Sequence, residues 1–342
     1  MKAAIFHEAG KPLTIGEIAS PDPGPHELVL KVHACGICGS DLHCTEHGPF
    51  VLPGETVMGH EFAGEVVGMG TEIAGRFAEG DRVTALPVIV PPIPPVGMED
   101  VEPWMRGDSQ TIGLGQVPGA YAEYVRVGVN MTKRLPDPVS YEMGALVEPL
   151  AVGLHAVNRA DMRSGDNVLV LGAGPIGLAS IAFAQRMGAA NVVVSEMTDE
   201  RRALAESVGA TATIDAKGNV LEQFAEKTGA LMPDIVIEAV GVPGMVQQAI
   251  DFVKPKGRVV VVGVCQQQDQ MMPMVAIMKE VGVQFVLGYE PRDWDTVLSF
   301  MANDRLKVDH LVTHRVGFDA FPDAFEALRT PSDQCKVMLK PD

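Results

Sequence analysis

Three short segments in the first half of the chain carry side chains that bind divalent metals. They are CGICGSDLH at 35–43, GHE at 59–61 and EPL at 148–150. A catalytic zinc ion takes three protein ligands from sulfur, imidazole or carboxylate and keeps one position for substrate. A single cysteine is usually a small core residue and a single glutamate is usually solvated, so each residue alone says little. Together the three segments predict a catalytic metal site.

A glycine motif in the second half predicts a dinucleotide-binding turn. The apolar run at 168–171 leads into GAGPIG at 172–177, a G-x-G-x-x-G pattern between an expected strand and an expected helix. The first glycine permits a tight turn, the second lets pyrophosphate approach the backbone, and the third lets the helix pack closely. The helix N-terminus adds partial positive charge. The expected cofactor-binding positions are Gly172, Gly174, Pro175, Ile176 and Gly177.

An acidic residue follows the next apolar run, about 20 residues beyond the glycines. Glu196 stands where a carboxylate accepts hydrogen bonds from the adenosine ribose hydroxyls, and this favours NAD over NADP. The alternative is a solvated glutamate at a strand end. Arg201 and Arg202 lie nearby and could accommodate a 2′-phosphate, although Glu196 would repel one. We count Arg201 with Glu196 among the cofactor-binding candidates.

The elements that position these residues differ between the two halves of the chain. From residue 167 onward, apolar runs of strand length alternate with helical segments such as 175–187, which predicts βαβ units and a doubly wound parallel sheet. Six strands are expected. They are 168–171, 192–195, 212–214, 235–239, 259–262 and 284–288.

The first 149 residues read as short alternating strands, such as 28–32 and 61–68, in an irregular antiparallel barrel. The proline-rich stretch 87–97 is expected to be an extended surface loop, because proline removes backbone donors. The tail from 291 to 342 has no place in the parallel sheet and is expected to return to the first domain. We therefore predict a catalytic domain at 1–149, completed by 291–342, and a dinucleotide-binding domain at 150–290, with an active site in the cleft between them.

Composition excludes several classes of partner. The 342 residues carry a formal net charge of −17, which repels nucleic acid and anionic membrane surfaces. No apolar stretch is long enough to span a membrane, and the N-terminal residues do not read as a targeting segment. The five cysteines suggest packing or metal binding and no disulfide framework. We expect a cytoplasmic protein.

The motifs resemble, in type and order, those of the zinc-dependent medium-chain dehydrogenase/reductase superfamily. GICGSDLH, GHE, EPLAVGLHA and the glycine turn carry the resemblance, which extends from MKAAIF to KVML. It is nearest to the polyol, butanediol and threonine dehydrogenase branch, which has Glu, as at Glu148, where other branches have Cys. The resemblance implies an α/β fold with a doubly wound Rossmann sheet and a GroES-like irregular β-barrel catalytic domain. It also implies NAD-dependent oxidation of a secondary alcohol to a ketone.

The same resemblance assigns the metal ligands. Cys38 and His60 would bind zinc. Glu61 and Glu148 are alternatives for the third protein ligand, or they exchange at that position as water and substrate bind and leave. Many family members carry four cysteines for a second, structural zinc. Residues 85–119 contain no cysteine, so we expect one catalytic zinc ion, no structural zinc, and a lobe held by packing.

Further roles follow from the resemblance. Ser40 and His43 match the family's proton relay, and Asp41 matches a carboxylate that supports the metal ligands. Zinc would lower the pKa of the alcohol, and its proton would pass through Ser40 to His43. Lys336 aligns with a basic position that contacts pyrophosphate; an exposed lysine is the alternative. The apolar segment 283–288 resembles a dimer-forming edge strand, which predicts a homodimer or a homotetramer.

The substrate class and two other functions stay open at this stage. The branch suggests a diol or polyol. The lobe also contains the apolar residues Ile89, Val90, Ile93, Val96, Trp104 and Met105. They suggest a more hydrophobic substrate, such as a cyclic alcohol; alternatively, they pack the lobe itself or an interface. A zinc-free NADPH-dependent enone or quinone reductase, or a non-enzymatic nucleotide-binding protein, would share the fold. Neither needs Cys38, His60 and Glu148, so the ligand set favours the dehydrogenase.

Overall fold

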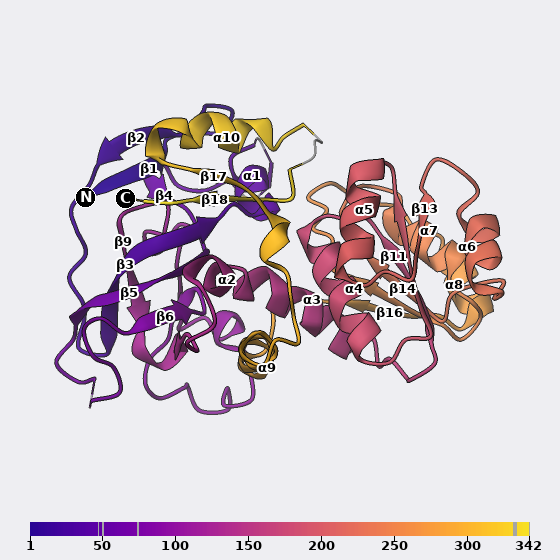
Figure 1. The fold of residues 1–342 in the computed structure, drawn as a ribbon, viewed down its shortest axis with the longest axis horizontal. Coiled ribbons are helices and arrows are strands. Elements are labelled where there is room, and N and C mark those ends of the chain that lie inside the picture. Colours follow the sequence, from indigo (N-terminus) through magenta and orange to yellow (C-terminus); the bar gives the residue numbers. More distant parts are fainter. Residues whose placement is uncertain (47, 50, 74, 331–333, 342) are drawn as a thin grey trace. The chain divides into compact units, whose positions relative to one another are not determined.

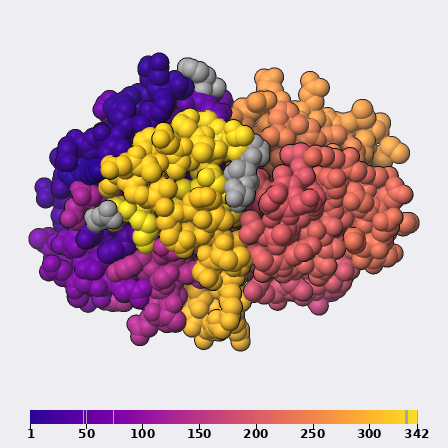
Figure 2. Space-filling view, turned by 45° about the horizontal axis from the view of Figure 1, so that its top comes forward, coloured from indigo at the N-terminus to yellow at the C-terminus, as the bar shows by residue number. Residues whose placement is uncertain are grey.

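The chain folds into two compact units. The computed structural model describes residues 1–46, 48–49, 51–73, 75–330 and 334–341 (Figure 1). The first unit contains 1–148, 298–305 and 312–342, and the second contains 149–297 and 306–311. Within the first unit, Figure 2 shows the yellow C-terminal residues lying against the indigo N-terminal residues. Each unit is described separately below.

The first unit is built on mainly antiparallel sheets, in which only β17 and β18 pair in parallel among the described strands. The largest has the strand order β10-β6-β5-β3-β18-β17, with β9 also paired to β3, and a smaller sheet has the order β2-β1-β4. The bounds are β1 Lys2–Phe6, β2 Thr14–Glu17, β3 Glu27–Gly36, β4 Thr56–Val57, β5 Glu61–Met69, β6 Arg82–Ala85, β9 Tyr124–Gly128, β10 Thr132–Arg134, β17 Val312–Val316 and β18 Lys336–Leu339. Apolar side chains of these strands alternate into a common core with Phe321 and Phe325 of α10 (Phe321–Ala327).

The C-terminal strand completes this sheet. β18 pairs antiparallel with β3, with Leu339 opposite Cys35 and Met338 opposite Gly36. All four residues of β18 are buried, which is expected of a strand with neighbours on both sides. The tail therefore adds a strand beside the segment that carries the first metal-binding motif.

The second unit contains the doubly wound parallel sheet that the sequence predicts. Its strand order is β13-β12-β11-β14-β15-β16, every pair is parallel, and the order reverses between β11 and β14. The strands are β11 Asn167–Leu171, β12 Asn191–Glu196, β13 Ala212–Asp215, β14 Ile235–Glu238, β15 Arg258–Val261 and β16 Gly282–Phe285. The intervening helices are α4 Pro175–Arg186, α5 Asp199–Val208, α6 Val220–Thr228, α7 Met245–Phe252 and α8 Pro273–Lys279.

Three local expectations need correction. Pro87, Val88 and Ile89 are buried, and Val88–Ile89 forms β7 against β8 (Gln110–Thr111), so only the later part of the proline stretch is a surface loop. Ile93 and Val96 are 81% and 98% exposed and do not pack the lobe. The last parallel strand covers 282–285 instead of 284–288, because pairing with β15 ends before the apolar run does.

A buried carboxylate joins two helices of the second unit. Asp293 in α9 (Pro291–Ala302) lies 2.9 Å from His155 Nδ1 and accepts a hydrogen bond of 2.8 Å from Asn158 Nδ2, both in α3 (Val147–Arg159). It also accepts the N–H of Glu290.

Among the described residues, no helix is long and apolar enough to cross a membrane.

Asp293→Ala should destabilise the protein by about 2 kcal/mol, because the buried His155 and two less buried donors, Asn158 Nδ2 and the Glu290 N–H, lose their partner. Trp294 is fully buried next to this site, so urea unfolding followed by tryptophan fluorescence reports the change. Asp293→Asn keeps the shape and one acceptor oxygen and should cost less than half as much. An unchanged unfolding midpoint in the alanine variant would show that the carboxylate is dispensable.

Candidate metal centre and dinucleotide site

The pairing of β3 with β5 brings the first two metal-binding segments together. Gly36, the last residue of β3, stands opposite Glu61, the first residue of β5. Cys38 lies two residues beyond β3, at the N-cap of α1 (Gly39–Cys44), and His60 immediately precedes β5. One ligand atom from each of Cys38, His60 and Glu61 lies within 4.8 Å of the other two. In the described part of the chain this is the only such group of three.

Asp41 orients His60. Its Oδ1 lies 3.2 Å from His60 Nδ1 in an ion-pair contact that is not aligned as a hydrogen bond. Its Oδ2 accepts hydrogen bonds from Cys38 N at 3.1 Å and from the Tyr121 hydroxyl at 2.5 Å. Burial alone would lower the pKa of His60, but Asp41 and Cys38 raise it well above its usual value. With Nδ1 facing a carboxylate, Nε2 is the nitrogen left for a metal.

Lys336 pairs with Glu61 inside the protein. Its Nζ donates to both Glu61 carboxylate oxygens at 2.7 Å and to the Ile37 carbonyl at 2.9 Å, which uses all three N–H bonds. Burial alone would lower the pKa of Lys336, but Glu61 raises it far above its usual value. Lys336 is 2% exposed. The structure therefore corrects both sequence-based alternatives, the pyrophosphate contact and the exposed lysine.

The close packing requires a glycine at position 36. A Cβ atom there would lie 2.2 Å from Glu61 Oε2 and 3.2 Å from Lys336 Cδ. The carboxylate and the lysine stem thus occupy the space that a side chain would need. No local pattern predicts this contact, because Lys336 lies 275 residues from Glu61.

The donor set fits zinc. Zn–S distances of about 2.3 Å and Zn–N or Zn–O distances of about 2.0–2.2 Å put neighbouring tetrahedral ligands roughly 3.3–3.7 Å apart. The Cys38, His60 and Glu61 atoms need only small shifts from their 4.8 Å limit to reach that spacing. Sulfur, imidazole and carboxylate are the ligand types that zinc takes in catalytic sites. His60 Nδ1 and Asp41 Oδ1 are also buried without a hydrogen bond, as expected of groups that a metal-bound imidazole would align.

The remaining candidates of the first unit are placed as follows. Glu148 is buried in the first turn of α3 and, among the described residues, is not part of the three-residue cluster. Ser40 and His43 both lie on α1 and are partly exposed. No hydrogen bond joins these two side chains within the described chain. Asp41, on the same helix, is fully buried.

The glycine turn of the second unit has the expected form. Gly172 has a φ of +91°, a backbone conformation that glycine favours. A Cβ atom at Gly177 would lie 2.1 Å from the Gly172 carbonyl oxygen, so the third glycine allows the turn to close. A Cβ atom at Gly174 would meet nothing within 4 Å, which leaves this side of the turn open. Pro175 begins α4 with Gly174 as its N-cap, so the helix N-terminus faces the open turn.

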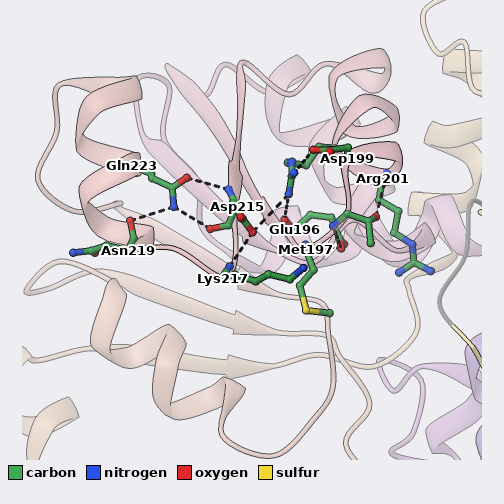
Figure 3. Close-up of polar contacts among 10 residues, drawn as sticks. Glu196, Met197, Asp199, Arg201, Asp215, Lys217, Asn219 and Gln223 are labelled. Carbon is green, nitrogen blue, oxygen red and sulfur yellow. Dashed lines mark hydrogen bonds and ion pairs between the residues drawn. The ribbon is translucent and has the colours of Figure 1, made fainter.

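Glu196 is more constrained than the sequence suggests. It ends β12, is 7% exposed, and accepts the backbone N–H of Ala173 at 2.9 Å through Oε2. Its Oε1 accepts the N–H groups of Met197 at 2.7 Å and Thr198 at 3.3 Å (Figure 3). A carboxylate has about four acceptor positions, so roughly one is left for a ligand. The solvated-glutamate alternative does not describe this side chain.

The two arginines beyond Glu196 have different surroundings. Arg202 donates to the Glu196 carbonyl at 2.6 Å and pairs with Asp199 and, at 3.8 Å, with Asp215. Arg201 lies in the first turn of α5, and within the described residues its guanidinium has no hydrogen bond or ion pair (Figure 3). Arg201 is therefore one cation in this region that is available to a ligand.

Comparison with known proteins identifies the family. Residues 175–303 match a model of zinc-binding dehydrogenases, and residues 24–137 match a model of the alcohol dehydrogenase GroES-like domain. Sorbitol dehydrogenase of Gallus gallus is 35% identical over 99% of this chain and 96% of its own. The chain belongs to the zinc-dependent medium-chain dehydrogenase/reductase superfamily, and it is an alcohol dehydrogenase within it. The family and fold class predicted from the motifs are confirmed.

Two bacterial relatives are similar over their whole length. (R,R)-butanediol dehydrogenase of Bacillus subtilis (strain 168) is 35% identical over all of both chains. The crystal structure of 2R,3R-butanediol dehydrogenase from Bacillus subtilis superposes with a TM-score of 0.88 over 100% of this chain and 99% of its own, at 34% identity. A protein of Sinorhizobium meliloti 1021 assigned as a zinc-binding dehydrogenase and bound to NADP is 32% identical, with a TM-score of 0.89 and 99% of each chain covered.

Proposed function

We propose that this protein oxidises a secondary alcohol of a diol or polyol to the ketone, with one zinc ion and NAD. The observation that carries the proposal is the Cys38, His60 and Glu61 cluster with Asp41 behind it. The similarity to sorbitol and butanediol dehydrogenases supports hydroxyl-rich substrates. The lobe residues Ile93 and Val96 are exposed and give no support for a hydrophobic substrate.

Cys38, His60 and Glu61 are the proposed zinc ligands. Glu61 is preferred to Glu148 as the third because its carboxylate belongs to the described cluster. Lys336 neutralises Glu61 and holds both of its oxygens, so the carboxylate is fixed beside Cys38 and His60 before any metal binds. We propose one ion per chain, since residues 85–119 supply no cysteine for a structural zinc.

Bound zinc supplies Lewis acidity toward the alcohol oxygen, and bound nicotinamide accepts the hydride. The chain's own residues manage the proton and the geometry. Asp41 holds the His60 ring through Nδ1 and is itself held by Tyr121. Ser40 and His43 lie on the helix that follows Cys38, which supports proton transfer from the substrate hydroxyl through Ser40 to His43 and on to solvent.

The motifs assign a different role to each of the two units. We propose that residues 1–149 and 291–342 form the catalytic domain and that 150–290 bind the dinucleotide. Gly172, Gly174, Pro175, Ile176 and Gly177 are the proposed pyrophosphate-binding residues. Glu196 and Arg201 are proposed to contact the adenosine ribose. Among the described residues, Cys35, Cys38, Cys44 and Cys265 form no disulfide, which is consistent with the cytoplasm as the proposed compartment.

The purified protein should reduce NAD in the presence of sorbitol or 2,3-butanediol and should contain about one zinc per chain. Cys38→Ser, His60→Ala and Glu61→Gln should each lose zinc and reduce turnover by at least about 100-fold, because each removes a ligand. NADH binding, measured by fluorescence, should stay within about twofold. Glu148→Gln is the matched control, because it removes a buried carboxylate outside the cluster.

Two outcomes decide against this assignment. Full turnover in a metal-free preparation would refute the zinc-dependent reaction. Zinc loss in Glu148→Gln but not in Glu61→Gln would exchange the roles of the two glutamates. Elemental analysis and turnover on the same samples separate these outcomes.

Glu196→Ala should weaken NAD binding roughly tenfold and NADP binding less, because the alanine removes both a ribose acceptor and a charge that repels the 2′-phosphate. Arg201→Ala should act in the opposite sense and weaken NADP more. Calorimetric titration of each variant with both cofactors measures the ratio. Glu196→Gln removes the charge but keeps one acceptor oxygen, so it separates the loss of charge from the loss of all three backbone hydrogen bonds. An unchanged NAD to NADP ratio in both variants would remove these residues from the ribose site.

We propose that β16 pairs with its copy in a homodimer or a dimer of dimers. β16 is an edge strand; Phe285 at its end and Leu287 just beyond it are 58% and 63% exposed. Sedimentation of the purified protein should show a dimer or tetramer, and Phe285→Glu should dissociate it. Leu231→Glu, at an 83% exposed leucine away from this edge, is the control. A monomeric wild-type protein would exclude the proposal.

A further inference from the structure

A second buried glutamate lies at the carboxyl edge of the parallel sheet. Glu238 is the last residue of β14 and is 1% exposed. Within the described residues it forms no ion pair. Burial raises the pKa of its carboxyl, and backbone N–H groups only partly offset this. An unpaired buried acid is costly, so its hydrogen bonds need an explanation.

Glu238 holds two loops at once. Its Oε1 accepts the N–H of Val240 at 2.7 Å and of Gly241 at 2.8 Å, which fixes the loop after β14. Its main-chain carbonyl accepts the N–H groups of Val262 at 2.9 Å and Gly263 at 3.0 Å, which fixes the loop after β15. One residue therefore sets the backbone of both loops.

The two loops leave no room for adjustment. A Cβ atom at Gly263 would lie 2.6 Å from Glu238 Oε2 and 2.4 Å from Gly241 N. A Cβ atom at Gly241 would lie 2.7 Å from Val264 N. On the other side, a Cβ atom at Gly172 would lie 2.9 Å from Val240 Cγ2. The loops after β11, β14 and β15 are thus in direct contact, and displacement of one moves the others.

The strand order indicates which half of the cofactor lies here. In a doubly wound sheet the dinucleotide crosses the point where the strand order reverses, which is between β11 and β14. The adenosine half belongs on the β12 side, near Glu196, so the nicotinamide half must pass over the ends of β14 and β15. Val240, Val242 and Val264 are 44%, 47% and 51% exposed at these ends and offer an apolar surface for a ring.

We propose that Glu238 is a positioning residue for the nicotinamide half of the cofactor. It acts through the backbone of 239–241 and 262–264 and does not touch the cofactor itself. Its Oε1 fixes the first loop, and its Oε2 occupies the space that Gly263 leaves empty. This inference rests on the proposed function, because it assumes that the crevice binds a nicotinamide dinucleotide.

Binding of NADH and of ADP separates the two halves of the cofactor. In Glu238→Ala, NADH should bind roughly tenfold more weakly, while ADP, which contacts only the adenosine side, should change by less than about twofold. Glu238→Gln should recover most of the NADH affinity, because its amide oxygen can accept the same two N–H bonds. NADH fluorescence and ADP calorimetry on the holoenzyme give both values.

Two further measurements keep the test decisive if the alanine variant folds poorly. Gly263→Ala leaves the acid in place but forces a methyl group against Glu238 Oε2 and Gly241 N, and it should reproduce the selective loss of NADH. Amide hydrogen exchange of Val240 and Gly241 should accelerate in Glu238→Ala and not in Glu238→Gln, with or without ligand.

The outcomes of these measurements separate failure of this inference from failure of the proposed function. If the affinities for NADH and ADP fall equally, Glu238 only stabilises the unit, and the proposal is overturned. Unchanged NADH affinity in both Glu238→Ala and Gly263→Ala would overturn it as well. A wild-type protein that binds neither NADH nor ADP would overturn the proposed function, and this inference with it. Tight NADH binding by the wild type and by Glu238→Ala would overturn the inference alone.

Discussion

The antiparallel register between β3 and β5 is the constraint on which the metal centre depends. With Gly36 opposite Glu61, the residues just beyond one strand and just before the other converge, so Cys38 and His60 meet beside the Glu61 carboxylate. A shift of one residue would turn Glu61 to the opposite face of the sheet and separate the three ligand atoms. The buried strands around this point make such a shift costly, since it would also expose their core side chains.

Charge balance explains why so many ionisable groups are tolerated in this core. Asp41 and Glu61 are fully buried, and each has a dedicated partner: His60 and Tyr121 for Asp41, and Lys336 for Glu61. Breaking a buried pair leaves an uncompensated charge, whereas an intact pair costs little in net terms. The pairs therefore favour one arrangement, which brings together sulfur, imidazole and carboxylate, the ligand types that zinc takes in catalytic sites.

The second unit also contains buried carboxylates, and these fix loop backbone instead of metal ligands. Glu196 at the end of β12 and Glu238 at the end of β14 both accept backbone N–H groups of the loops that follow or adjoin their strands. The two strands flank β11, whose glycine turn lies between them in the sheet. The carboxyl edge of the sheet is thus fixed on both sides of the turn by short hydrogen bonds that backbone N–H groups donate to buried acids. Such fixed loops lower the ordering cost of binding a flexible dinucleotide.

The sequence by itself determined the class of fold, the glycine turn, the six parallel strands and two members of the metal cluster, Cys38 and His60, because strand patterning, turn residues and short motifs are local signals. Only the tertiary structure decided that Glu61, and not Glu148, joins Cys38 and His60. It also decided that Lys336 pairs with Glu61 and that the Glu196 carboxylate is bound to Ala173. These contacts join residues up to 275 positions apart, and strand register and burial, which no local pattern encodes, select each partner.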